Sequence, residues 1–257
     1  MINKKNKKLV NILKVGTGLA AVGAITVGIT MALLSAQTEK VKNTFTPSGG
    51  IDLVLTEPNW EVDGEASHFA PGSEIPKDPT IEVPVNSSQD EYVAAIVKYY
   101  VDLDGNGVYE DKEEISYSEF TSKYANIFYL NGSEVSTASK SYNTEDWATL
   151  DNSIYYYGTK AEAAGLNVFE KSAKDSNGEV IKNESKLFDT VVVNKNIPTY
   201  SSDTKDSSGK VLYKKGQPIA FKIDVKAYGV QDSLEKADAF NALNLMIEGK
   251  DPNEAIK

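Results

Sequence analysis

The chain has 257 residues, of which 40% are hydrophobic and 25% charged, and its formal net charge is −10. This composition is typical of a folded protein rather than of a disordered chain. Every basic residue is a lysine, so the planar guanidinium groups that grip phosphates are missing, and nucleic acid is not an expected partner. Cysteine is absent and His68 is the sole histidine, which excludes disulfides, thiolate metal sites and a zinc site of paired histidines.

Residues 1–32 are predicted to be a signal peptide. Five lysines precede an uncharged stretch of about twenty residues, which is long enough to cross a bilayer as a helix. Cleavage is predicted after Ala32, because Thr30 and Ala32 have the small side chains and the spacing that a signal peptidase prefers; Ala36 is a second candidate site. The alternative is a retained membrane anchor. In either case the rest of the chain is expected outside the cytoplasm, with membrane contact only through an uncleaved leader.

Residues 33–50 are predicted to be a mostly polar N-terminal arm that ends in a glycine pair. Val41 and Phe45 are its larger apolar side chains beyond the two leading leucines. The folded domain is expected to span residues 51–257. It begins with alternating apolar and polar residues, the pattern of a half-buried strand, and Pro58 ends that strand because proline cannot donate to a ladder.

The rest of the domain is predicted to be built from short strands. Four prolines in residues 71–84 exclude a helix there, and β-branched and aromatic residues favour a buried strand in the segment that follows. Strands are expected at residues 91–103, 125–130, 154–157, 187–193 and 217–231, the last with clear alternation. The polar segment 171–186 is interpreted as a long hairpin tip.

A single C-terminal helix is predicted at residues 233–248, with Ser233 as its N-cap and Gly249 as its stop. Leu234, Ala237, Ala242 and Leu245 stand at helical spacing. Many short strands followed by one helix predict an all-β fold, a β-sandwich with long loops and a short C-terminal helix.

The segment DLDGNGVYEDKE at residues 102–113 matches a twelve-residue calcium loop, with Gly107 at the sharp turn. Its ligand positions are filled in order by Asp102, Asp104, Asn106, the carbonyl of Val108, Glu110 and Glu113. The alternative is a plain hairpin turn, because Asp-Gly and Asn-Gly are strong turn dipeptides. Since the flanking sequence favours strands over helices, we expect Ca²⁺ to stiffen a hairpin here rather than to operate a sensor.

A second acidic cluster, Glu57, Glu61, Asp63 and Glu65, stands close to His68. It could serve a metal-assisted hydrolase. The HExxH motif is absent and one histidine cannot supply the usual zinc pair, so a solvated strand end is the favoured interpretation.

Several stretches, taken in order, resemble the TasA and camelysin family of Gram-positive bacteria. They are NTFTPSGGIDLVLTEPNW (43–60), PGSEIPKDPTIEV (71–83), EYVAAIVKY (91–99), DNSIYYYG (151–158), SKLFDTVVV (185–193) and FKIDVKAYGVQ (221–231). The resemblance implies a jelly-roll-like fold, export through a dedicated signal peptidase, and a place in the extracellular matrix or on the cell surface.

The resemblance also implies a structural, non-enzymatic subunit of biofilm-matrix fibres. In such fibres the freed arm of one subunit completes a sheet of the next, giving a head-to-tail homopolymer. Here the donor would be residues 37–46, with Val41 and Phe45 as anchors, and an accessory matrix protein is a further candidate partner. Two alternatives stay open, a camelysin-like secreted metallopeptidase and a monomeric cell-surface binding module.

Overall fold

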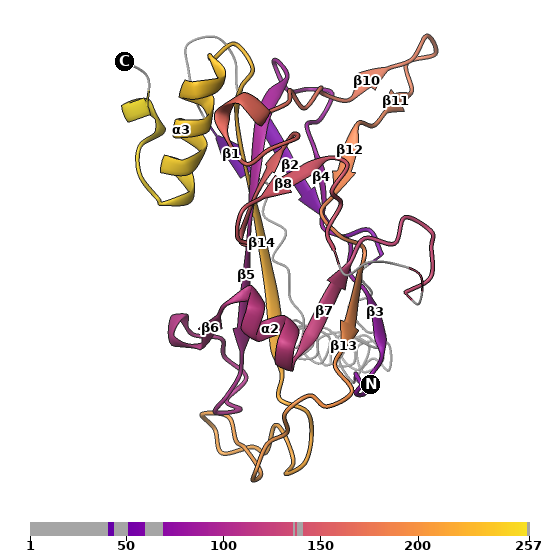
Figure 1. Ribbon diagram of the computed structural model, residues 1–257, viewed down its shortest axis with the longest axis vertical. Helices are drawn as coiled ribbons and strands as arrows, with labels where there is room; N and C mark the ends of the chain where they lie inside the picture. Colours follow the sequence, from indigo (N-terminus) through magenta and orange to yellow (C-terminus); the bar gives the residue numbers. More distant parts are fainter. Residues whose placement is uncertain (1–40, 44–50, 60–68, 136, 138–140, 256–257) are drawn as a thin grey trace, which may run out of the picture.

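The computed structural model describes residues 41–43, 51–59, 69–135, 137 and 141–255 (Figure 1). The strands, in chain order, are β1 (Val41–Asn43), β2 (Ile51–Thr56), β3 (Glu74–Pro76), β4 (Thr80–Glu82), β5 (Glu91–Val101), β6 (Glu114–Ile115), β7 (Ala125–Phe128), β8 (Trp147–Thr149), β9 (Ile154–Tyr157), β10 (Ala173–Lys174), β11 (Val180–Ile181), β12 (Glu184–Lys186), β13 (Thr190–Val193) and β14 (Phe221–Gln231).

The helices are α2 (Tyr117–Lys123) and α3 (Lys236–Ile247), with short 3-10 segments η2 (Asp111–Glu113), η3 (Ala163–Gly165) and η4 (Pro252–Ala255). None of the helices in the described ranges has the length and apolar character that a bilayer crossing needs. The predicted signal peptide with its cleavage site at Ala32, the arm residue Phe45, and His68 lie outside the described residues.

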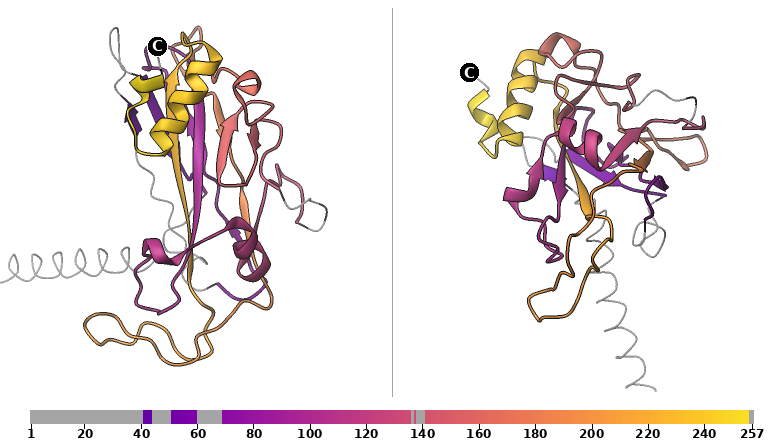
Figure 2. Two further views of the ribbon diagram at one scale, coloured as in Figure 1. Left: turned by 60° about the vertical axis from the view of Figure 1, so that its left-hand side comes forward. Right: turned by 60° about the horizontal axis from the view of Figure 1, so that its bottom comes forward.

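The strands form antiparallel sheets that pack as a sandwich (Figure 1 and Figure 2). One layer is a five-stranded sheet of order β14-β5-β9-β8, with β6 paired to β5. The facing layer contains a four-stranded sheet, β1-β2-β4-β12, and a three-stranded sheet, β3-β13-β7. The predicted all-β, jelly-roll-like sandwich with a short C-terminal helix is therefore confirmed.

The two longest strands, β5 and β14, have 11 residues each and pair along their full length. Phe221, Ile223 and Val225 of β14 point into the main core, as the alternation in the sequence predicts. The facing odd-numbered residues of β5 lie in the same core, whereas Tyr92 and Ala94 are buried on the opposite face beneath α3 (Figure 2). Burial on both faces explains why the sequence of β5 is an almost continuous run of apolar residues.

The C-terminal helix begins later than predicted. Its N-cap is Glu235 rather than Ser233, because the residues before it still form a turn in which the Leu234 N–H donates to the Gln231 carbonyl. Ala242 is buried, but Ala237 is exposed, so the predicted inward face is only partly right. The predicted stop is confirmed: Gly249 has a φ of +72°, and its N–H donates to the Met246 carbonyl.

The predicted hairpin tip at residues 171–186 is confirmed as a two-stranded ribbon that projects from the body of the molecule (Figure 1). β10 and β11 pair only with each other, and β12 then rejoins the sandwich beside β4. The Asp175 carboxylate accepts the N–H groups of Asn177 and Glu179 and so closes the turn.

Candidate functional site: the acidic loop and the arm

The predicted calcium loop closes a hairpin between β5 and β6. The chain leaves β5 at Val101, passes through the loop and η2, and returns so that Ile115 pairs with Tyr99 and Glu114 with Tyr100. A strand therefore enters the loop and a strand leaves it, with a single 3-10 turn where the second helix of a helix-loop-helix unit would begin. The expectation that strands rather than helices flank the loop is therefore confirmed.

Three predicted ligands come together in the loop. One carboxylate oxygen each of Asp102, Asp104 and Glu113 lies within 4.8 Å of the other two. Asp102 and Glu113 are buried, whereas Asp104 is exposed and leaves an approach from solvent. Three carboxylates in this arrangement offer a divalent cation hard oxygen ligands.

Backbone N–H groups hold the two buried carboxylates in place. Asp102 accepts Asn106 N at 3.0 Å and Gly107 N at 2.9 Å, and Glu113 accepts Leu103 N at 3.0 Å and Glu110 N at 3.2 Å. Burial raises the pKa of Asp102 to about 6, with a smaller contribution from the negative charge of Glu113, while the hydrogen bond from Gly107 opposes the shift. A bound cation would offset the repulsion among these carboxylates.

The other predicted ligands stand beside this group. Asn106 donates to the Asp104 carboxylate at 3.0 Å, and its own side-chain oxygen accepts Val108 N at 2.6 Å. The Glu110 carboxylate pairs with Lys112 at the surface. Asn106 and Glu110 would therefore complete a cation shell only after their side chains leave these partners.

A segment that is distant in the sequence, around Tyr200, holds the start of the acidic loop in place. The Tyr200 hydroxyl donates to the Asp102 carbonyl at 2.9 Å and accepts Ala220 N at 3.1 Å, which ties the start of the loop to the start of β14. Gly105 has a φ of +67°, and a Cβ there would lie 2.4 Å from the Thr204 side chain. Sequence reasoning missed this clamp, because nothing local marks a partner about a hundred residues away.

The middle of the predicted arm forms β1, which pairs with β2 of the same chain. The antiparallel register places Val41 opposite Leu53 and Lys42 opposite Asp52. β1 is three residues long and is the outermost strand of its sheet. The arm therefore has a partner in its own chain, and pairing with another copy requires this ladder to be exchanged.

The second acidic cluster is only partly visible, because Glu61, Asp63, Glu65 and His68 lie outside the described residues. The prediction of a solvated strand end is wrong for Glu57, whose side chain is 4% exposed and pairs with the fully buried Lys77 at 2.7 Å. Burial raises the pKa of Glu57 and lowers that of Lys77, and their mutual attraction opposes both shifts.

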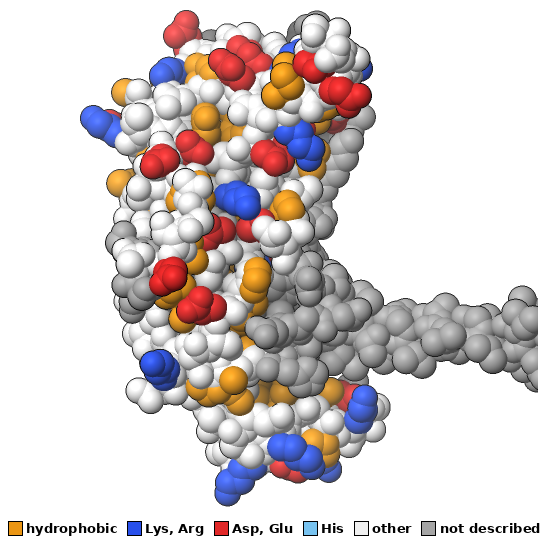
Figure 3. All heavy atoms as spheres, turned by 90° about the vertical axis from the view of Figure 1, so that its right-hand side faces the viewer, with side chains coloured by type: hydrophobic (Ala, Val, Ile, Leu, Met, Phe, Trp, Pro, Cys, Tyr) orange, Lys and Arg blue, Asp and Glu red, His pale blue; other side chains and the backbone are white. Residues whose placement is uncertain are grey.

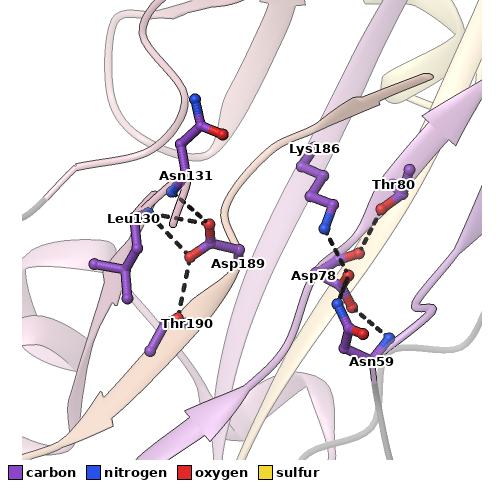
Figure 4. A network of polar contacts seen from close by, with 8 residues as sticks. All are labelled: Asn59, Asp78, Thr80, Leu130, Asn131, Lys186, Asp189 and Thr190. Carbon is purple, nitrogen blue, oxygen red and sulfur yellow. Dashed lines mark hydrogen bonds and ion pairs between the residues drawn. The ribbon is translucent and has the colours of Figure 1, made fainter. Parts of the chain in front are cut away.

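A polar network adjoins this ion pair (Figure 4). The buried Asp78 accepts the backbone and side-chain N–H groups of Asn59 at 2.9 and 2.7 Å and lies 3.0 Å from the Lys186 amine. Farther along, Asp189 accepts the N–H groups of Leu130 and Asn131, which fixes the turn after β7. These carboxylates are satisfied by donors within the fold, so their evident role is to join segments.

No protein-family model matches the chain, and no curated protein matches it significantly. The resemblance to the TasA and camelysin family therefore rests on the ordered stretches of sequence alone.

Proposed function

We propose that this protein is a secreted structural subunit that polymerises into extracellular fibres. The basic and apolar leader supports export, and the short edge strand β1 supports exchange of the arm between copies. The arm of one subunit would leave its own β2 and pair with β2 of the next. No enzymatic activity is part of this proposal.

The observation that carries the proposal is the position of β1. It is held to the sandwich by a ladder of only three residue pairs, on the open side of β2. The sequence between β1 and β2 contains Pro47, Gly49 and Gly50, residues suited to a hinge. A neighbour's arm would make the same backbone hydrogen bonds with β2, so the exchange costs little free energy. If the exchanged arms do not join the subunits into a closed ring, the product is a filament.

The edge of β14 that faces away from β5 lies next to the sheet that holds the arm. Asp102 N donates to Ala220 O, so even-numbered residues of β14 direct their backbone groups toward β5 and odd-numbered residues direct theirs away. Within the described ranges β14 pairs with no strand other than β5. β1 and β2 lie beside β14, so the arm and this edge meet at one corner of the sandwich.

We further propose that Ca²⁺ binds the acidic loop and stiffens the subunit. Asp102, Asp104 and Glu113 would be the primary ligands, with Asn106, Glu110 and the Val108 carbonyl completing the shell. The ion supplies charge neutralisation and a fixed loop geometry. Outside the cell, where calcium is at about millimolar concentration, even a weak site would be occupied.

Asn43→Pro in the mature protein is expected to abolish filaments. Asp52 directs its backbone N–H to Ser87 and away from β1, so the hydrogen-bonded pairs of the β1–β2 ladder are the flanking ones, which include Asn43 with Ile51. Proline at Asn43 removes a ladder donor and disfavours pairing with any β2, whether in the same chain or in another. Negative-stain electron microscopy of the purified protein provides the measurement. Circular dichroism should show an unchanged β-rich spectrum, because β2 and the strands that follow it supply the described core.

The matched control is Asn43→Ala, which keeps the backbone donor and should still form filaments. Filaments of normal length and number from Asn43→Pro would reject arm exchange. Wild-type protein that stays monomeric at high concentration, with and without calcium, would reject the polymer itself.

A further inference from the structure

The ion pair between Glu57 and Lys77 is closed off from water. The Lys77 side chain is fully buried and that of Glu57 is 4% exposed, and Lys77 Nζ lies 2.7 Å from Glu57 Oε1. Lysine and acidic side chains also lie near one another on the surface, as Figure 3 shows for one face, but water hydrates those groups. The buried pair is surrounded by protein, so its two charges cost free energy to maintain.

Both members of the pair are shifted toward their uncharged forms. Burial lowers the pKa of Lys77 and raises the pKa of Glu57, and their mutual attraction opposes both shifts. The negative charges of Asp78 and Asp224 raise the pKa of Glu57 further. A lysine amine is a nucleophile only when it is uncharged, and a carboxyl carbon accepts a nucleophile more readily when the group is protonated. Burial therefore favours the protonation states that amide formation needs.

One oxygen of Glu57 takes no part in the ion pair. Glu57 Oε2 is buried and has no hydrogen-bond partner in the described part of the chain. A buried carboxylate oxygen without a donor costs free energy. Condensation of the carboxyl group with the lysine amine would expel this oxygen as water and would remove both buried charges.

Neighbouring contacts hold the two side chains at close range. The β2–β4 ladder ends directly before Glu57. Asp78, next to Lys77, accepts the backbone and side-chain N–H groups of Asn59 (Figure 4). Because Glu57 Cδ is one bond from Oε1, it lies within about 4 Å of Lys77 Nζ. Groups fixed in this way can react as if at an effective concentration of about 10⁵ to 10⁸ M.

We infer that Lys77 and Glu57 join in an intramolecular isopeptide bond. A proton passes from Lys77 Nζ to the Glu57 carboxyl group along their hydrogen bond, and the uncharged amine then attacks Cδ. The Nζ–Cδ bond forms and the Cδ–Oε2 bond breaks. Two protons of the ammonium group leave with Oε2 as one water molecule, so atoms and charge balance without a co-reactant.

The bond would fasten the strand that pairs with the arm. Glu57 directly follows β2, and Lys77 lies between β3 and β4, so the amide would tie these segments of the facing layer together. In a chain without cysteine, it would restrict the unfolded chain as a disulfide does. The inference goes beyond the proposed function and does not depend on it, because both groups belong to one chain.

Mass spectrometry of the folded mature protein tests the bond. The wild type is expected to be lighter than its sequence by the mass of one water molecule. Trypsin does not cleave after an acylated lysine, so the digest should contain residues 43–98 as one peptide, with Glu57 linked to Lys77, in place of 43–77 and 78–98. Cleavage after Lys98 is the internal control, because Lys98 pairs with Glu114 at 2.8 Å but the two side chains are 40% and 38% exposed.

Two variants complete the test. Lys77→Arg keeps the positive charge and the trypsin site but has no nucleophilic amine, so it should keep its full mass. Glu57→Met/Lys77→Met should also keep its full mass and should fold, because apolar side chains of similar size can replace a buried ion pair. Loss of water from this double variant would place the modification elsewhere. Wild-type protein with its full mass and complete cleavage after Lys77 would overturn the isopeptide bond and leave the fibre proposal standing.

Discussion

Replacing Glu91 by glutamine is expected to stabilise the folded protein at alkaline pH and to flatten the pH dependence of its unfolding free energy. Glu91 opens β5 and is fully buried. One carboxylate oxygen accepts the Ser87 hydroxyl at 3.2 Å, and the other has no hydrogen-bond partner and lies against Gly229. Burial raises the pKa of Glu91 to about 8, with smaller contributions from Asp52 and Asp90.

The raised pKa of Glu91 determines whether stability rises or falls with pH. Between its ordinary value of 4.5 and about 8, the folded protein holds a proton on Glu91 that the unfolded chain releases. The contribution of Glu91 to stability is therefore fully present below about pH 4.5 and is lost as the pH rises to about 8, by roughly 5 kcal/mol in total. Urea unfolding of wild type and Glu91→Gln from pH 5 to 9 measures this.

The matched control for Glu91 is Glu235→Gln, whose exposed side chain makes no capping hydrogen bond to α3. It should leave the slope against pH as in wild type. If Glu91→Gln also kept the wild-type slope, Glu91 would not hold the proton. The charge on Glu91 matters for assembly because the neighbouring Asp52 belongs to β2, the strand that pairs with the arm.

Glu113→Gln is expected to remove most of the stabilisation that calcium gives. With a dissociation constant of about 0.1 to 1 mM, 10 mM calcium would stabilise the wild-type fold by roughly 1 to 3 kcal/mol. Glu113 is one of three carboxylates that converge, and both its oxygens are already positioned by backbone N–H groups. Glutamine there removes a negative charge and one oxygen ligand.

Titration calorimetry and thermal unfolding, each with and without calcium, provide the measurement for Glu113. Glu119→Gln on α2 is the control, because Glu119 lies outside the loop and pairs with Lys123 at the surface. It should respond to calcium as wild type does. Equal responses of wild type and Glu113→Gln would dismiss the site, as would a flat wild-type titration.

Local sequence patterns are sufficient to predict the strands and the acidic loop. Phe221, Ile223 and Val225 alternate with Lys222 and Asp224 because one face of β14 is in the core, and such alternation is visible in sequence. The acidic loop could likewise be found because its ligands are contiguous, a property of few sites.

Contacts between distant residues could not be predicted in this way. Glu57 looks like one more solvated acid in the sequence, yet it pairs with Lys77, which is buried. The tie from Tyr200 to Asp102 spans 98 residues. Residue type alone favours Ser233 as the N-cap, whereas the position of the turn after β14 decides where α3 begins.

Exchange of the arm between chains can be measured most directly with two singly substituted mature proteins, Lys42→Cys and Asp52→Cys. These residues face each other in the β1–β2 ladder, at a separation suited to a disulfide. Mixed, assembled and oxidised, the two proteins are expected to form a covalent heterodimer through these cysteines, because each arm lies on another chain. Filaments in which both thiols stay free would show that every arm remains on its own β2, and would contradict the account.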